Sequence, residues 1–191
     1  MKATHNPYNP GAGVPPPDLA GRDALIELAR VAIIRAKAGR PAKSAIMLGL
    51  RGVGKTVLLN AFEAIADEQG CQTALIEIEP TMPLAQQLAP QLQHILHRLD
   101  RLKKAGADLQ RAFGSLRSFA SMFKATVADI DFSLAATPAT GDLIIDLTDL
   151  FVAIAEAAKK RDTAIVLLID EIQYLKKSDL SALIMAMHKM A

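Results

Sequence analysis

The sequence contains few of the residues that mark disulfide-bonded, membrane-spanning or strongly charged proteins. Cys71 is the only cysteine among 191 residues, so no disulfide can form within the chain and a reducing compartment is expected. Tryptophan is absent and aromatic residues make up 4% of the chain, which favours a helix-rich α/β protein over an all-β sandwich. The formal net charge of +2 indicates neither a nucleic-acid binder nor a membrane-surface protein on bulk charge alone.

Long apolar runs are also missing. No segment holds the roughly 18 uninterrupted apolar residues that a membrane span needs. Residues 1–20 are rich in proline and glycine, lack the apolar core of a signal peptide, and are expected to form an extended N-terminal arm. These absences predict a soluble, cytoplasmic protein with no membrane partner. Hydrophobic residues nevertheless make up 51% of the chain, which is enough for a sizeable core, and the length suits one domain.

Apolar residues follow two spacings along the chain. Three short apolar runs predict buried strands, namely SAIMLGL at 44–50, QTALIEIE at 72–79 and AIVLLID at 164–170. Helical spacing predicts six helices, which begin near Asp23, follow the run at 44–50 as far as Gly70, and then cover 83–104 with a break or kink at Pro90, 107–124, 146–160 and 178–190. This alternation predicts an α/β fold with three layers around a parallel sheet.

Two of these helices carry specific expectations. In the first helix, Leu25 and Leu28 lie at helical spacing with Ala29 and Ala32, so this stripe is expected to face the core. In the helix over 146–160, Asp146 is expected to be the N-cap residue.

The stretch GLRGVGKT matches the pattern G-x-x-x-x-G-K-[ST]. Phosphate oxygens need a row of backbone N–H groups that bulky side chains would block, and the following helix aims its N-terminal dipole at the same anion. We therefore expect the whole stretch to contact nucleotide phosphates: Gly49, Leu50, Arg51, Gly52, Val53, Gly54, Lys55 and Thr56. Lys55 would reach the β- and γ-phosphates, and the Thr56 hydroxyl would bind Mg²⁺.

Two acidic residues end the third apolar run, in VLLIDEIQYL. Ligands gather at the carboxyl ends of the strands of a parallel sheet, which is where Asp170 and Glu171 would lie. Asp170 would hold the Mg²⁺ ion, directly or through water, and Glu171 would orient and polarise the attacking water. Without the glycine-rich stretch, the two acids would indicate only a charged strand end.

Three stretches resemble the AAA+ ATPases, a group of P-loop NTPases: LAGRDALIELARVAI, GLRGVGKTVLLNAFE and VLLIDEIQYL. The likeness is greatest to the initiator-like bacterial and archaeal branch and covers residues 17–79 and 146–190. It implies an ATPase that uses ATP and Mg²⁺, in which Gly21 and Arg22 border the adenine. Members of this family commonly complete their sites between subunits, so a homo-oligomer is compatible with the resemblance.

The resemblance also implies a sheet of strand order 5-1-4-3-2, of which this chain matches only part. The strands and the helical lid that follow the Asp-Glu strand in the family are not found in the sequence. Residues 21–191 are therefore expected to be the N-terminal part of an incomplete AAA+ domain. In that case the predicted strand at 44–50 would lack both of its neighbours.

The stretch 98–145 matches none of these motifs and is expected to be a helical and hairpin insertion. Ile130, Phe132 and Leu134 alternate with polar residues, as in a hairpin strand. Seven basic residues and three phenylalanines lie within 98–124, which could be a surface for a protein or DNA partner. They are Arg98, Arg101, Lys103, Lys104, Arg111, Arg117 and Lys124, with Phe113, Phe119 and Phe123. We favour an amphipathic helix with a solvated basic face and phenylalanines in the core.

Other functions of a phosphate loop remain to be weighed against the ATPase. A GTPase would need an Asn-Lys-x-Asp motif, which does not occur, and Asp170 is followed by Glu-Ile-Gln instead of the spacing to glycine that a GTPase uses. A small-molecule kinase would need an arginine-rich lid, which we do not find. A nucleotide-dependent binding module or switch would hold ATP or ADP without turnover, and it stays open as the alternative to ATP hydrolysis.

Overall fold

The fold is a mixed arrangement of helices around two parallel strands. A computed structural model describes residues 21–49, 54–102, 106–127 and 138–190. Their elements are α1 (Asp23–Lys37), α2 (Lys55–Glu68), β1 (Gln72–Glu77), α3 (Leu84–Leu102), α4 (Ala107–Met122), α5 (Leu143–Lys159), β2 (Ile165–Asp170), the short 3-10 helix η2 (Ile172–Tyr174) and α6 (Lys177–Met190). Within these residues no helix is both long and apolar enough to cross a membrane.

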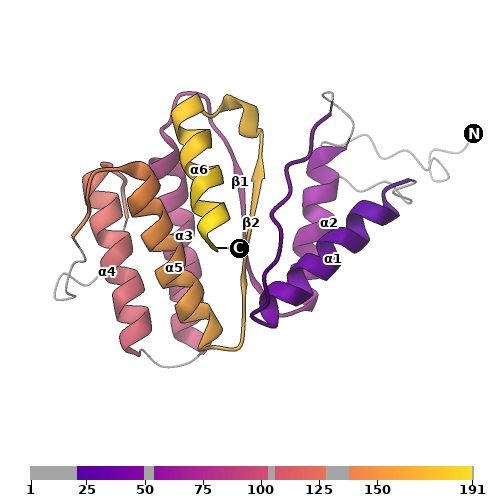
Figure 1. The fold of residues 1–191 in the computed structure, drawn as a ribbon, viewed down its shortest axis with the longest axis horizontal. Coiled ribbons are helices and arrows are strands. Elements are labelled where there is room, and N and C mark those ends of the chain that lie inside the picture. The colour runs from indigo at the N-terminus through magenta and orange to yellow at the C-terminus, as the bar shows by residue number, and fades with distance from the viewer. Residues whose placement is uncertain (1–20, 50–53, 103–105, 128–137, 191) are drawn as a thin grey trace, which may run out of the picture.

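The two strands lie side by side between two groups of helices. β1 pairs with β2 in parallel, in a register that runs from Gln72 opposite Ile165 to Glu77 opposite Asp170. Figure 1 shows α1 and α2 on one side of the strands and α3, α4, α5 and α6 on the other. The chain between β1 and β2 passes through α3, α4 and α5, the long crossover that parallel strands require. The predicted α/β class with a parallel sheet is therefore confirmed for the two strands that the structure describes.

The larger hydrophobic core lies on the side of α3, α4, α5 and α6. Its most deeply buried side chains include Leu88 and Leu96 of α3, Phe119 of α4 and Leu150 of α5. Phe113 and Phe123 pack against the same core, so the phenylalanines of the basic stretch point inward as we favoured. A break or kink was predicted at Pro90, and α3 continues through this residue without a break. The apolar contacts on its buried face offset the hydrogen bond that proline cannot make.

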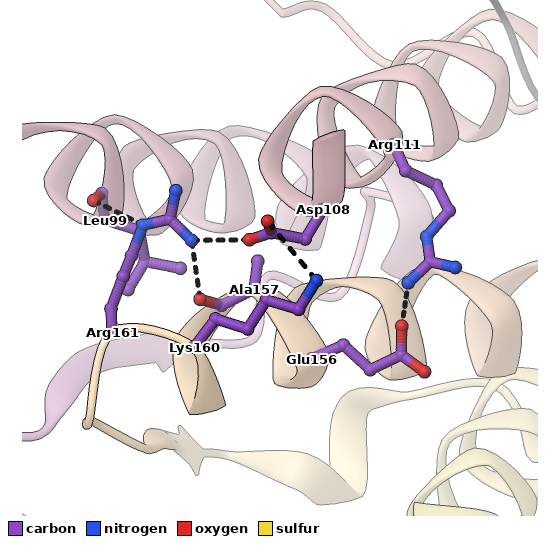
Figure 2. A network of polar contacts seen from close by, with 7 residues as sticks. All are labelled: Leu99, Asp108, Arg111, Glu156, Ala157, Lys160 and Arg161. Carbon is purple, nitrogen blue, oxygen red and sulfur yellow. Dashed lines mark hydrogen bonds and ion pairs between the residues drawn. The ribbon is translucent and has the colours of Figure 1, made fainter. Parts of the chain in front are cut away.

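A polar network connects helix α4 to its neighbours (Figure 2). Arg161 is 2% exposed, and its guanidinium donates to the carbonyls of Leu99 at 2.9 Å and Ala157 at 2.8 Å and to the carboxylate of Asp108 at 2.6 Å. Asp108, in the first turn of α4, is 9% exposed and also lies 3.6 Å from the Lys160 ammonium. The hydrogen bond from Arg161 lowers the pKa of Asp108. α3, α4 and α5 are thus joined by one buried cation.

The buried face of α1 differs from the expected one. Leu25 is 40% exposed and Leu28 is 58% exposed, so the predicted stripe does not face a core. Ile33 is buried and Ile26 packs beside it, in a smaller cluster with Ile65 of α2 and residues at the strand ends. The prediction was wrong because α1 carries apolar residues on more than one face, and helical spacing alone cannot choose between them.

The predicted strand at 44–50 does not form in the described part of the chain. Residues 41–49 have no regular secondary structure and pair with neither β1 nor β2. Ile46 is 47% exposed and Leu48 is 92% exposed, although a buried strand was expected. A single extended segment cannot satisfy its own N–H and carbonyl groups, so without a neighbouring strand the apolar run alone does not make a strand.

The start of α5 corrects a further expectation. Asp142 is the N-cap residue, and its Oδ1 accepts from the N–H groups of Ile144 at 2.8 Å and Ile145 at 3.2 Å. Asp146 lies in the first turn instead, and its buried carboxylate accepts from the N–H groups of Thr140 at 2.8 Å and Gly141 at 2.9 Å. The helix begins earlier than predicted because the Asp142 side chain already satisfies its first free N–H groups.

The stretch 98–145, which the sequence predicts to be an insertion, contains the end of α3, helix α4 and the start of α5. The predicted hairpin residues Ile130, Phe132 and Leu134 and the predicted arm at 1–20 lie outside the described residues. The described basic residues of the stretch 98–124 lie on more than one helix. Arg98 and Arg101 belong to α3, whereas Arg111 of α4 forms an ion pair with Glu156 of α5 (Figure 2).

Candidate functional site

The glycine-rich stretch leads directly into α2. Gly54 precedes the first helical residue and has a left-handed backbone with φ of 81°, a conformation that glycine adopts without strain. Lys55 is the first residue of α2, and Thr56 follows in the same turn. The first-turn N–H groups and the positive end of the dipole of a 14-residue helix therefore lie at the end of this stretch. The predicted contact residues Leu50, Arg51, Gly52 and Val53 lie outside the described residues.

The Lys55 side chain contacts the first residue of the glycine-rich stretch. Its Nζ donates to the carbonyl of Gly49 at 3.2 Å. This contact holds the ammonium beside the backbone that precedes α2. The structure thus keeps the cation and the helix N-terminus together.

Thr56 and Asp170 meet across 114 positions of sequence. The Thr56 hydroxyl donates to Oδ2 of Asp170 at 2.5 Å. Thr56 is held by the first turn of α2, and Asp170 is the last residue of β2. The carboxyl end of β2 and the N-terminus of α2 are therefore in direct contact. A hydroxyl and a carboxylate in this arrangement offer two hard oxygen donors to a divalent cation.

Glu171 follows in an unusual backbone conformation. Its φ is 54°, in the left-handed region that residues other than glycine rarely adopt. Its N–H donates to Oδ1 of Asp170 at 2.8 Å, and its carbonyl accepts from the N–H of Tyr174 at 3.0 Å. The Gln173 side-chain amide donates to the Glu171 carboxylate. The backbone turn and the amide together fix where this carboxylate lies.

Gln173 is a residue that the sequence reasoning missed. It follows Glu171 by two positions, and the 3-10 turn of η2 brings its amide back to the Glu171 carboxylate. The sequence Glu-Ile-Gln has no periodic pattern that would predict this turn. The contact accompanies the positive φ at Glu171. The sequence does not reveal a positive φ at a residue other than glycine.

The remaining predicted residues lie beside α1. Gly21 has φ of 74°, and Arg22 is the N-cap residue of α1. Their expected contact with adenine stays a prediction. Among the described residues, which include His94 and His97 of α3, no group of three or more His, Cys, Asp or Glu side chains that could hold a metal ion is found.

One comparison with known proteins assigns this arrangement to a family. A family model described as the AAA ATPase domain matches residues 18–190, which cover α1, the glycine-rich stretch and the end of β2. The chain belongs to the AAA ATPase domain family. No curated protein and no solved structure matched the sequence. For an AAA ATPase domain, nucleotide binding and hydrolysis are the general functions of the family, and the resemblance read from the sequence is confirmed at the level of the family.

The candidate site of this AAA ATPase domain combines four kinds of group near the carboxyl end of β2. They are a helix N-terminus, an ammonium at Lys55, the oxygen pair of Thr56 and Asp170, and a second carboxylate at Glu171. Positive groups suit phosphate oxygens, the oxygen pair suits a hard cation, and the second carboxylate can accept a proton from water.

Proposed function

We propose that this AAA ATPase domain binds ATP together with Mg²⁺ and hydrolyses it, within a three-layer P-loop fold. The hydrogen bond between Thr56 and Asp170 at 2.5 Å is the observation that carries the proposal. Mg²⁺ commonly takes one or two oxygen ligands from the protein and completes its octahedral shell with water and substrate phosphates. A pair of one hydroxyl and one carboxylate fits this demand, whereas a site for zinc would need His or Cys ligands.

Each remaining group has a role in phosphoryl transfer. The N–H groups at the start of α2 bind phosphate oxygens, and Lys55 neutralises the charge on the β- and γ-phosphates. Bound Mg²⁺ supplies further neutralisation of the charge that builds on these oxygens. Glu171 orients a water molecule towards the γ-phosphate and takes up its proton. Gln173 holds the Glu171 carboxylate and so sets the direction in which it acts.

The alternative is a switch that binds ATP or ADP without turnover. Two observations favour it. The segment 44–49, which leads into the glycine-rich stretch, is mostly exposed and pairs with no strand in the described part of the chain. The same exposure supports the expectation of an incomplete sheet. The Glu171 carboxylate is also already engaged in a hydrogen bond with the side-chain amide of Gln173. Precise positioning of the reacting groups matters more for hydrolysis than for binding.

The substitution Glu171→Gln separates the two candidates. If Glu171 is the general base, phosphate release from ATP falls by about 100-fold or more, while the Kd for ATP changes by less than about twofold. Phosphate release and ATP binding are measured on the same preparation with Mg²⁺ present. Glu68→Gln, at the exposed end of α2, is the matched control and keeps wild-type turnover. Equal turnover in Glu171→Gln and the wild type would contradict the assigned role, and tight binding without turnover in both proteins would favour the switch.

A further inference from the structure

The strand β1 is paired along only one of its edges. The N–H groups of Gln72 and Ile78 donate to the carbonyls of Ala164 and Asp170, at 2.8 and 3.1 Å, and these bonds bracket the pairing with β2. Backbone groups of successive residues point to opposite edges of a strand. The even-numbered residues of β1 therefore face β2. Among the described residues no strand pairs with the opposite edge.

The odd-numbered residues of β1 form this free edge. Thr73, Leu75 and Glu77 direct their N–H and carbonyl groups away from β2. Thr73 is buried, Leu75 is half-buried and Glu77 is exposed, so the edge becomes more accessible towards the carboxyl end of the strand. A row of unpaired backbone groups is a template for another extended chain.

A cleft of about 520 Å³ runs along the same edge, between α2 and α3. Besides β1, it is lined by Glu63 of α2 and by Gln91, His94, Arg98 and Arg101 of α3. The four α3 residues are spaced by three or four positions, so they lie on one face of the helix. Two arginines and a histidine face one carboxylate, so the charge that this cleft can accept is negative.

Arg98 makes an incomplete set of contacts in this cleft. Its Nη2 donates to the carbonyl of Thr73, which belongs to the free edge. Its Nε is buried and has no hydrogen-bond partner among the residues that the structure describes. A carboxylate that binds a guanidinium side-on accepts one hydrogen bond from Nε and one from Nη2. In Arg98, Nη2 donates to a carbonyl and Nε donates to none of the described residues. An arriving strand would in turn offer an N–H group to the Thr73 carbonyl.

We propose that the free edge of β1 is a docking site for an extended, acidic segment of a partner protein. The segment lies beside β1 as an added strand and pairs with the backbone of Leu75 and Glu77. Its acidic side chains bind Arg98 and Arg101, and Arg98 exchanges the Thr73 carbonyl for a carboxylate. The basic residues of α3 select for acidic side chains, and pairing with the β1 backbone selects for an extended chain. This surface uses none of the residues of the proposed nucleotide site.

The test uses the full chain and a fluorescein-labelled peptide of alternating valine and glutamate, eight residues long. Fluorescence anisotropy is expected to show saturable binding, which Arg98→Gln and Arg101→Gln each weaken by tenfold or more. Arg101 is exposed, so its variant tests the proposal even if Arg98→Gln disturbs folding. Lys189→Gln, an exposed change outside the cleft, is the matched control and leaves the affinity unchanged. No saturable binding, or equal affinities in all four proteins, would overturn the proposal.

Two further measurements distinguish a docked strand from simple charge attraction. A peptide with N-methyl groups at alternate positions keeps its charge but cannot pair, and it is expected to bind at least tenfold more weakly. Hydrogen exchange at the N–H groups of Leu75 and Glu77 is expected to slow when the unmodified peptide binds. Unchanged exchange at these two groups would overturn the proposal. A further result would be a short single-stranded DNA that displaces the peptide and loses affinity in the same arginine variants. That result would overturn the proposal and assign the cleft to phosphate binding.

Discussion

At the scale of single residues, the candidate site contains one side chain, that of Glu171, on a backbone in the left-handed conformation. Glu171 has the left-handed φ that costs about 1 to 2 kcal/mol in a residue other than glycine. Hydrogen bonds from its own N–H to Asp170 and from Tyr174 to its carbonyl offset this cost. Strain of this kind is common where a side chain must point in a functional direction. The conformation therefore agrees with an active role for the Glu171 carboxylate.

Protonation of Asp108 is expected to weaken the fold in acid. Because the hydrogen bond from Arg161 lowers its pKa from the ordinary value of 3.8, Asp108 stabilises the folded state above that value. This contribution is lost as the pH falls through the lowered pKa. Thermal melting between pH 7 and pH 3 is expected to show a steeper acid decline in Tm for the wild type than for Asp108→Asn.

The same variant tests the buried pair at neutral pH. Asp108→Asn leaves the Arg161 guanidinium buried without its carboxylate, which costs about 3 kcal/mol. Arg111→Gln, which breaks only the exposed ion pair with Glu156, is the control and costs less than about 1 kcal/mol. Parallel acid slopes in the wild type and Asp108→Asn would show that Asp108 does not carry the pH dependence.

The site residues differ in how far the sequence could place them. Two sequence patterns were enough to predict that Thr56 and Asp170 lie at the same end of the strands, where they form a hydrogen bond. These patterns are the fixed spacing of the glycine-rich stretch and the pair of acids that follows an apolar run. This works because each residue is tied to the end of a regular element. Gln173 and the left-handed Glu171 depend on a turn between elements, for which no periodic pattern exists.

At the scale of secondary structure elements, burial depends on which neighbours are present. The apolar spacing of α1 predicted a helix correctly but selected the wrong face, since Leu28 is exposed and Ile33 is buried. The apolar run at 44–50 predicted a strand, yet residues 44–49 find no strand to pair with in the described chain. Spacing and composition are local properties, whereas a face or a strand is completed by partners distant in sequence.

Two substitutions in α1 measure which of its faces is packed. Ile33→Ala removes a side chain that is 6% exposed and is expected to lower the free energy of unfolding by about 3 kcal/mol. Leu28→Ala, on the exposed face, is expected to change it by less than about 0.5 kcal/mol. Urea unfolding of both variants checks these values. A larger effect for Leu28→Ala would mean that α1 packs through the face that its sequence first indicated.

At the scale of the whole molecule, the two strands separate a small group of helices from a large one (Figure 1). α1 and α2 carry the glycine-rich stretch, and the larger core with α6 supports β2 and its acidic end. The hydrogen bond between Thr56 and Asp170 links the two sides at the point where ATP and Mg²⁺ are proposed to bind. Nucleotide bound there would add contacts to both sides and would stabilise the fold by mass action.

The most direct test is a titration of the full chain with a fluorescent ATP analogue and Mg²⁺. We expect saturable binding that Lys55→Ala abolishes, that Lys189→Ala leaves unchanged and that GTP displaces poorly. Lys55 is decisive because its ammonium lies beside the helix N-terminus that would bind the phosphates. Absence of binding by the folded wild type, or equal binding by Lys55→Ala, would contradict the central claim that this end of the strands binds ATP.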